Sequence, residues 1–291
     1  MAFLAVSIAA RDTTAALAEL QRAAAAADLA ELRLDLMQEF DLPRLLASRP
    51  LPLIVTCRPA REGGAWQGSE AERLAVLRTA AALGADYVDL EWDCAAEAAM
   101  LERSRTRLIL SRHDFAGMPA NLPAMAADLW AAGADVVKVV GAARRLADCA
   151  PALQLLDAAT RPTIAIAMGA CGLVTRLLAF RYPHAFLSFA APDPPGAGAA
   201  VAAAATAPGQ ITLGAMRALY RVRAIGQGAR LIGLLAPDAN TSPLIEEGNR
   251  WLAQTGMDAV LLPLQVAADE QPEQAIDVLR AFSLIMHWPQ E

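Results

Sequence analysis

The sequence is poor in the residues that bind metals and form redox centres. It has three histidines and four cysteines without a C-x-x-C pair, namely Cys57, Cys94, Cys149 and Cys171. Zinc sites and dithiol centres need such residues clustered at short spacing. We therefore expect a metal-free protein whose cysteines are reduced, as is usual in the cytoplasm.

Clustered positive charge and long apolar runs are also missing. The formal net charge is −6 and the pI is near 5.2, which makes nucleic acid and anionic membranes poor partners. No apolar stretch reaches the roughly 18 to 20 uncharged residues that cross a membrane. The opening MAFLAVSIAA has no basic segment before it and is followed by Arg11 and Asp12. It therefore predicts a strand and not a signal peptide, and we expect a cytoplasmic protein.

Hydrophobic residues make up 56% of the 291 residues, whereas aromatic residues make up 5%. This composition suits buried parallel strands covered by Ala-rich helices and excludes a disordered chain. The length would hold one α/β barrel of about 250 residues together with a short appendage.

Short β-branched or Leu-rich runs alternate eight times with longer segments of helical spacing, which is typical of consecutive βα units. The predicted strands are 3–8, 30–35, 51–57, 86–91, 107–111, 135–140, 162–168 and 185–190. The predicted helices are 13–27, 42–47, 69–83, 95–104, 122–132, 144–159, 173–180 and 212–222. Eight such units favour an α/β fold of the (β/α)8 TIM-barrel type, although an open sheet is the alternative.

Two later segments interrupt this pattern. The Pro/Gly/Ala-rich stretch over residues 191–206 predicts a mobile loop over the barrel mouth. The stretch AIGQGAR resembles a linker, and a new strand-like run begins at Arg230. We predict a barrel domain over residues 1–223 and a small α/β appendage over residues 230–291, called the C-terminal unit below.

Polar residues occur where the predicted strands end, which is where barrel enzymes carry their active sites. Lys138 lies inside the strand DVVKVV, where a charged amine is costly unless it is paired or has lost its proton. A neutral amine could attack a ketone. His113 ends the neighbouring strand and could move protons near neutral pH, with Glu62 or Asp114 orienting its ring. The alternatives are a lysine that extends to solvent and a structural histidine.

Further charged residues follow other strands. They could present donor forks to a carboxylate or bind hydroxyl groups, and they are Glu31, Arg33, Arg58 and Arg176. The alternative is a salt-bridge network that closes the barrel top, which we favour for Asp89 and Glu91. No phosphate-binding glycine motif occurs, and the pair Gly63–Gly64 predicts only a tight turn.

Six segments, in order, resemble those of type I 3-dehydroquinate dehydratase, a Schiff-base enzyme of the shikimate pathway with a (β/α)8 barrel. They are ELRLD, TCRPAREGG, SRHDF, ADVVKVV, MGACGLVTR and ATAPGQ. The resemblance covers residues 1 to about 223. It implies the loss of water from 3-dehydroquinate to give 3-dehydroshikimate, with no metal or cofactor.

The resemblance also implies roles for individual residues. Lys138 becomes the imine-forming nucleophile and His113 the general acid and base, with Glu62 beside the histidine. Arg176 becomes the clamp for the substrate carboxylate. The residues assigned to the substrate hydroxyls and to the electrostatics of the site are Glu31, Arg33, Arg58, Thr206 and Gln210. Thr206 stands where the family usually has serine.

The C-terminal unit is similar to a truncated N-terminal part of shikimate dehydrogenase. Ser242 and Pro243 remain from the loop pattern of that family. We expect a remnant without dehydrogenase activity that serves as a packing or homodimer surface. An amphipathic helix predicted over residues 274–286 would suit this role.

Two other functions remain open at this point. The chain could be another lysine-imine barrel enzyme of the aldolase type, although SRHDF and APGQ argue against it. It could also be a non-catalytic scaffold that keeps the barrel and binds partners through the C-terminal unit.

Overall fold

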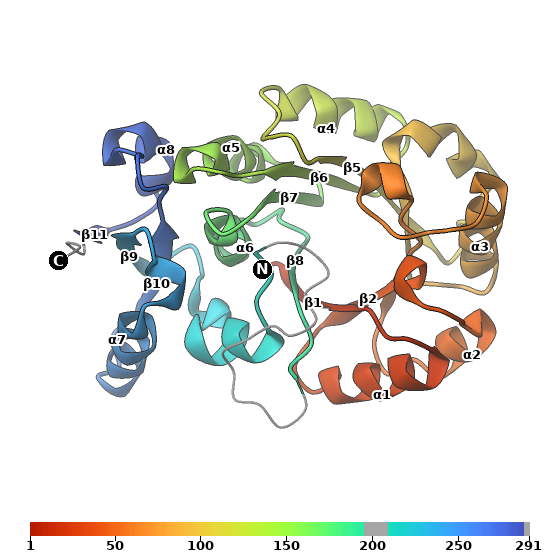
Figure 1. Ribbon diagram of the computed structural model, residues 1–291, viewed down its shortest axis with the longest axis horizontal. Helices are drawn as coiled ribbons and strands as arrows, with labels where there is room; N and C mark the ends of the chain where they lie inside the picture. Colours follow the sequence, from red (N-terminus) through yellow and green to blue (C-terminus); the bar gives the residue numbers. More distant parts are fainter. Residues whose placement is uncertain (195–208, 288–291) are drawn as a thin grey trace.

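A computed structural model describes residues 1–194 and 209–287. Within these residues, eight parallel strands form one sheet in the order β7-β6-β5-β4-β3-β2-β1-β8, with helices around it (Figure 1). The strands are β1 Phe3–Ile8, β2 Leu29–Arg33, β3 Leu53–Thr56, β4 Tyr87–Glu91, β5 Arg107–Asp114, β6 Val136–Ala142, β7 Thr163–Met168 and β8 Leu187–Ala190. The predicted TIM-barrel architecture is confirmed.

The first strand closes the barrel because it pairs with both β2 and β8. At the remaining seam, between β7 and β8, the backbone pairing is less extensive. Among the described residues the seam is bridged where Thr163 meets Ala185, below the start of β8. The barrel is therefore nearly closed, with its weakest seam next to β7.

Helices follow most strands, as the periodicity predicts. They are α1 Thr13–Ala23, α2 Leu42–Ala47, α3 Glu70–Ala82, α4 Leu122–Ala131, α5 Ala150–Ala158 and α6 Leu173–Leu178. Local chemistry sets several ends. Ser69 and Glu72 form a reciprocal capping box at the start of α3, and Gly84, at φ 81°, follows the end of that helix.

Two predicted helices differ from the structure. Residues 95–104 are not an α-helix, because a 3₁₀ run covers Trp92–Met100. In that run Ala98 is the one buried residue, and Trp92, Cys94 and Ala95 are partly buried against the core. Residues 212–222 contain a short π-helical turn, Ala215–Leu219, in place of a regular helix.

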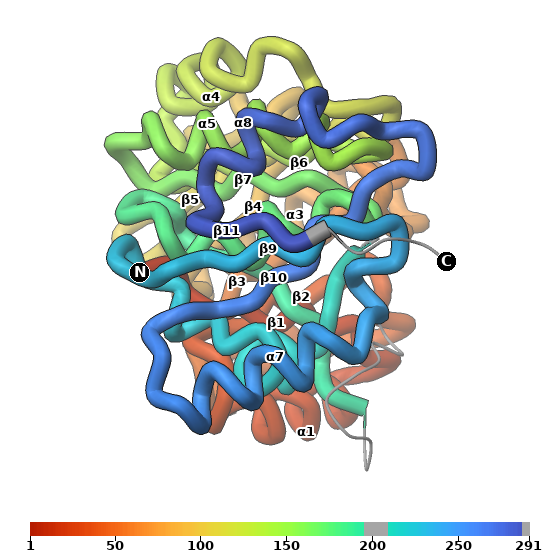
Figure 2. The backbone as a smooth tube through the Cα atoms, turned by 90° about the vertical axis from the view of Figure 1, so that its left-hand side faces the viewer, coloured from red at the N-terminus to blue at the C-terminus, as the bar shows by residue number. Residues whose placement is uncertain are grey.

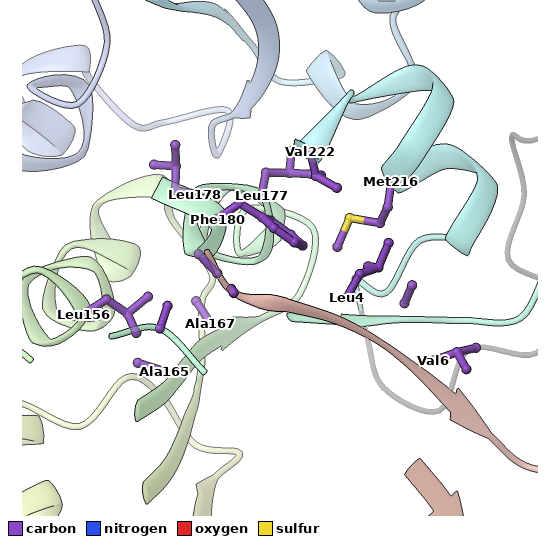
Figure 3. Packing of buried hydrophobic residues seen from close by; sticks show 14 of the residues in the cluster. Leu4, Val6, Leu156, Ala165, Ala167, Leu177, Leu178, Phe180, Met216 and Val222 are labelled. Carbon is purple, nitrogen blue, oxygen red and sulfur yellow. The ribbon is translucent and has the colours of Figure 1, made fainter. Parts of the chain in front are cut away.

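The barrel interior changes from apolar to polar along the strands. Its lower part is a cluster of aliphatic and aromatic side chains that includes Ala5, Ile54, Ile109 and Ile164. A second and larger cluster lies between the strands and the surrounding helices, where Leu4, Leu177, Phe180 and Met216 pack together (Figure 3). The apolar floor leaves the upper interior for polar side chains.

The C-terminal unit contains a second, three-stranded parallel sheet in the order β10-β9-β11. Its elements are β9 Arg230–Ala236, α7 Pro243–Gln254, β10 Ala259–Gln265, α8 Ile276–Leu279 and β11 Leu284–His287. Figure 2 shows this unit in front of the barrel. None of the helices in the described ranges has the length and apolar character that a membrane crossing requires.

The helix predicted over residues 274–286 is wrong. The helical part is short, Ile276–Leu279, and Leu284–His287 forms strand β11 beside β9. A free edge of β9 supplies hydrogen-bond partners to this segment, and such pairing between distant segments overrides the helical spacing of the sequence.

Candidate active site

Alternate strands place charged side chains in one layer above the apolar floor. Glu31 on β2, Asp89 on β4 and Lys138 on β6 point into the barrel at the same height, and the ring of Phe189 on β8 completes the layer. Side chains from alternate strands form such layers in (β/α)8 barrels. The fold therefore brings together residues that lie far apart in the sequence.

Lys138 is buried and paired. Its Nζ lies 2.9 Å from Asp89 Oδ2 and 3.5 Å from Glu31 Oε1. The ammonium group also lies 4.8 Å from the centre of the Phe189 ring. With 5% of the residue exposed, the alternative of a lysine that extends to solvent is wrong.

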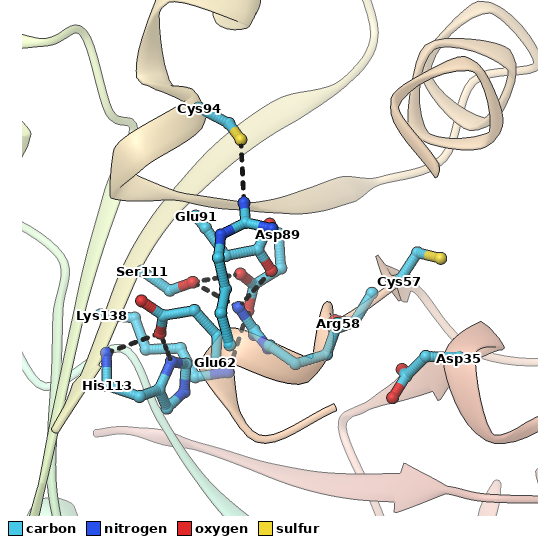
Figure 4. Close-up of polar contacts among 12 residues, drawn as sticks. Asp35, Cys57, Arg58, Glu62, Asp89, Glu91, Cys94, Ser111, His113 and Lys138 are labelled. Carbon is cyan, nitrogen blue, oxygen red and sulfur yellow. Dashed lines mark hydrogen bonds and ion pairs between the residues drawn. The ribbon is translucent and has the colours of Figure 1, made fainter. Parts of the chain in front are cut away.

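Asp89 connects the lysine to a chain of alternating charges (Figure 4). Its carboxylate accepts from Arg58 Nη2 at 2.8 Å and from Ser111 Oγ at 2.6 Å. Arg58 Nη1 then lies 2.6 Å from Glu91, whose other oxygen lies 2.6 Å from Arg73 Nη1. The predicted salt-bridge network thus exists, but Asp89 also holds the lysine.

The pKa values follow from these contacts. Burial would raise the pKa of Asp89, but the charges of Arg58 and Lys138 hold it well below its usual range. Burial also opposes ionisation of Glu31, yet Lys138 and Arg33 lower its pKa, and Ser7 and Thr56 donate to its two oxygens at 2.7 and 2.9 Å. Both carboxylates therefore stay negative beside the lysine.

His113 is oriented by Glu62. The ring Nδ1 lies 2.8 Å from Glu62 Oε2, and the backbone N–H of His113 donates to the same oxygen at 2.9 Å. Asp114 instead accepts from the backbone of Ala116. Burial, followed by the positive charge of Arg58, lowers the pKa of His113 well below its ordinary value. The imidazole is therefore neutral near pH 7 and can accept a proton.

Arg176 lies on α6 and differs from the other arginines of the site. It is 2% exposed, and its Nε has no hydrogen-bond partner among the described residues. Burial lowers its pKa to about 10, although the charge of Glu31 opposes that change. By contrast, Arg33 donates two hydrogen bonds to Asp35, at 2.8 and 2.9 Å. A buried guanidinium without a counter-ion is suited to an anionic ligand.

These side chains surround one cavity of about 120 Å³. It is lined by Glu31, Arg33, Arg58, Glu62, Gly63, His113, Phe115, Lys138, Val140, Ile166, Met168, Arg176, Phe189 and Gln210. Every predicted site residue that the structure describes is in this set. Thr206 and most of the predicted mouth loop lie outside the described residues.

Four further residues support the site. Asp89 was predicted only as part of a salt-bridge network, and Ser111, Arg73 and Phe189 were not predicted. Asp89 and Ser111 contact the lysine or its partner, Arg73 supports Glu91, and Phe189 covers the amine. The sequence held one further signal for the importance of Lys138, which is that it is the only lysine of the chain. Ser111 is brought to this place by register, because it pairs directly on β5 with Lys138 on β6. In the described part of the chain, no three His, Cys, Asp or Glu side chains are grouped as metal ligands would be.

Comparison with known proteins supports the family that the motifs predict. The family model described as type I 3-dehydroquinase matches residues 4–227. A 3-dehydroquinate dehydratase from Desulfotalea psychrophila is 35% identical over 204 residues, which are 67% of this chain and 86% of that protein. A chloroplastic bifunctional 3-dehydroquinate dehydratase/shikimate dehydrogenase from Arabidopsis thaliana is 34% identical over 88% of this chain. The chain spans 42% of the length of that bifunctional relative.

Solved structures agree. The crystal structure of 3-dehydroquinate dehydratase from Geobacillus kaustophilus covers 75% of this chain and 89% of its own, with a TM-score of 0.61 and 27% identity. The dehydroquinate dehydratase and shikimate dehydrogenase structure from S. pombe covers 97% of this chain and 56% of its own, with a TM-score of 0.60. At 20% identity, that likeness concerns the fold alone. The prediction from the motifs is confirmed, and the chain belongs to the type I 3-dehydroquinase family of hydro-lyases.

Proposed function

We propose that this chain removes water from 3-dehydroquinate through an imine on Lys138. One observation carries the proposal. The only lysine of the chain faces the same small cavity as a neutral histidine held by a carboxylate and an arginine that forms no ion pair within the described residues. Nucleophile, base and anion site are the three parts that dehydration of a keto acid through an imine requires.

The proposed steps balance as follows. Lys138 first gives one ammonium proton to the neutral ring of His113, and the free amine then attacks the ketone. His113 returns that proton to the carbinolamine hydroxyl, which leaves as water and gives the imine. His113 then takes a proton from the carbon next to the imine, the C–H electron pair forms a C=C bond to the imine carbon, and the C=N π pair moves onto the nitrogen to give an enamine. The electrons return to form the C=C bond as hydroxide leaves the next carbon, and His113 gives that hydroxide its proton. Hydrolysis consumes one water and frees Lys138, so one water is released overall.

The remaining side chains would hold the substrate in place. Arg176 binds the carboxylate, since its buried Nε has no hydrogen-bond partner among the residues that the structure describes. Glu31, Arg33, Arg58 and Gln210 contact hydroxyl groups or set the field of the cavity, and Thr206 adds a hydroxyl from the predicted mouth loop. Asp89 keeps the lysine side chain extended toward the cavity through its 2.9 Å contact.

Borohydride trapping tests the proposal directly. We expect a reduced adduct on Lys138 after incubation with 3-dehydroquinate and sodium borohydride, read by intact-mass and peptide mass spectrometry. Because the chain has one lysine, the only other primary amine is at the N-terminus. Lys138→Ala should give no adduct, whereas His113→Ala should still give one while product formation slows by about 10²-fold or more.

Two outcomes would contradict the mechanism. One is unchanged turnover in Lys138→Ala, and the other is a wild-type protein that leaves 3-dehydroquinate unchanged and forms no adduct. The second result would favour the scaffold alternative. An adduct with other keto acids but none with 3-dehydroquinate would favour the aldolase alternative.

Three broader expectations also belong to this proposal. They are a division into a barrel over residues 1–223 and the C-terminal unit over residues 230–291, a homodimer, and a cytoplasmic location. Sedimentation of the purified protein tests the dimer, and localisation of a tagged full-length chain tests the compartment.

A further inference from the structure

Helix α6 is buried on every side. All residues from Leu173 to Phe180 are at most 4% exposed, including Arg176. These eight residues are α6, Leu173–Leu178, and the first two residues of the 3₁₀ turn Ala179–Arg181 that continues it. Together they make more than two helical turns, so no face of this segment is open to water. A helix on the outside of a barrel normally has a polar outer face, and an all-round apolar helix must be covered.

The cover is strand β10 of the C-terminal unit. Helix α6 packs against β7 and β8 on the barrel side and against β10 on the other side (Figure 1). Strand β10 is itself covered twice, because α7 packs on its opposite face and its first six residues are buried. The barrel helix and the appended sheet therefore share one continuous core.

The register of β10 shows which side chains face α6. A methyl group added at Gly248 of α7 would lie 2.6 Å from Leu261 Cδ2, so Leu261 faces α7. Side chains alternate along a strand, which directs Leu262 to the opposite face, toward α6. Leu262 has no exposed surface, and Leu261 is 4% exposed. These neighbours form a matched pair on the two faces of one strand.

Polar contacts from the C-terminal unit hold the two barrel loops on either side of β7. Asn240 Nδ2 donates to the carbonyl of Ala170 at 2.8 Å, in the loop between β7 and α6. The carboxylate of Glu270 accepts from the backbone N–H groups of Leu146 and Ala147, both at 2.8 Å, in the connection from β6 to α5. Strand β6 carries Lys138, and α6 carries Arg176.

We propose that the C-terminal unit contributes to dehydratase activity by positioning Arg176. It does so by covering α6 and by fixing the loop before that helix. The proposal rests on the function proposed above. Asn240 and Leu262 are positioning residues that act through α6 and do not touch substrate. The guanidinium has no ion pair of its own within the described residues, so its position follows that of the helix backbone.

The link from the loop to the helix is short. Thr175 Oγ1, next to Arg176, accepts from the backbone N–H of Ala167 at 3.0 Å and donates to the carbonyl of Gly172 at 2.8 Å. A shift of the loop from 169 to 172 therefore moves the start of α6. A displacement of a binding group by about 1 Å can reduce catalysis by up to about 10²-fold.

The test compares two adjacent leucines in the full-length protein. Leu262→Ala and Leu261→Ala both open a cavity in β10, and both should lower the melting temperature. We expect Leu262→Ala to increase hydrogen exchange in the α6 peptide, residues 173–180, and to raise the KM for 3-dehydroquinate about three- to tenfold with little change in kcat. Leu261→Ala should leave both quantities as in the wild type.

A second pair tests the loop contact. Asn240→Asp removes the donor to Ala170 and places a negative charge against a carbonyl, whereas Gln254→Glu makes the same chemical change at an exposed site on α7. We expect KM to rise about fivefold for Asn240→Asp, as for the loss of one hydrogen bond, and not for Gln254→Glu. All assays are run well below the melting temperatures, so that each variant is folded.

The outcomes separate the two proposals. If wild type turns over 3-dehydroquinate but Leu262→Ala and Asn240→Asp leave KM and α6 exchange unchanged, the positioning proposal is overturned and the function stands. If the wild type is inactive, the proposed function fails, and with it the catalytic part of the positioning proposal. In that case, hydrogen exchange of residues 173–180 in the wild type and the variants still tests whether the C-terminal unit stabilises α6.

Discussion

Replacing Arg176 by methionine should stabilise the ligand-free protein. Burial lowers the pKa of this guanidinium to about 10, which is roughly 2.5 units below its ordinary value. At 1.36 kcal/mol per unit, the charged form is about 3 kcal/mol less favourable in the folded chain than in water. Because its pKa is lowered on folding, the charged Arg176 destabilises the folded state at all pH values below about 10, and removal of the charge should therefore stabilise the protein at pH 7.

We therefore expect Arg176→Met to increase the free energy of unfolding by about 1 to 3 kcal/mol, measured by urea denaturation at pH 7. Methionine fills a similar volume and brings no charge into the core. Arg217→Met is the control, because Arg217 is exposed and its loss should change stability by less than about 0.5 kcal/mol.

The same variant should lose the anion site. Quinate is a suitable probe, because it has the carboxylate and hydroxyl groups of the substrate without a ketone for Lys138. A ligand present at about 100 times its Kd stabilises the wild type by about 2.7 kcal/mol, and this gain should vanish in Arg176→Met. The reasoning would be refuted if the variant were less stable than the wild type, or if quinate raised both melting temperatures equally.

Three further predictions follow from the buried charges. Asp89→Asn should slow imine formation on Lys138 by about 10²-fold in single-turnover borohydride trapping, because the amine loses the contact that holds it. The value of kcat/KM should change less than about twofold between pH 8 and 6.5, because the lowered pKa of His113 keeps its ring neutral. A fall in kcat/KM centred near pH 6.5 would contradict this. The free energy of unfolding should instead decrease below about pH 6.5, because His113 is protonated in the unfolded chain but not in the folded one. Arg73→Met should destabilise the fold by about 3 to 5 kcal/mol in urea, since it leaves Glu91 without one of its buried partners; Arg78→Met at a half-exposed site should not.

Local patterns predicted most of the barrel. The eight strands are short apolar runs whose spacing does not depend on distant contacts, and helices such as α3 carry their own caps. The prediction failed where long-range pairing decides the structure. Residues 284–287 have helical spacing with the segment before them, but β9 offers an open edge and the segment becomes a strand.

The site shows the same division. Lys138, His113, Glu62 and Arg176 lie in local motifs, so their shared position at the barrel mouth could be predicted. The role of Asp89 could not, because it depends on the stagger between strands 49 residues apart in sequence. The same holds for the burial of α6, since nothing within that helix shows which later segment covers it.

The burial of α6 has a consequence during synthesis. The ribosome releases this helix well before β10, and in the interval the outer face of Leu173–Leu178 has no partner. Exposed apolar surface of this kind makes nascent chains prone to aggregation. A chain that stopped after the linker would contain every residue proposed for catalysis. Its α6, which carries Arg176, would still have an uncovered apolar face. We therefore expect the nascent barrel to be protected from aggregation only after the C-terminal unit has been synthesised and has folded onto α6.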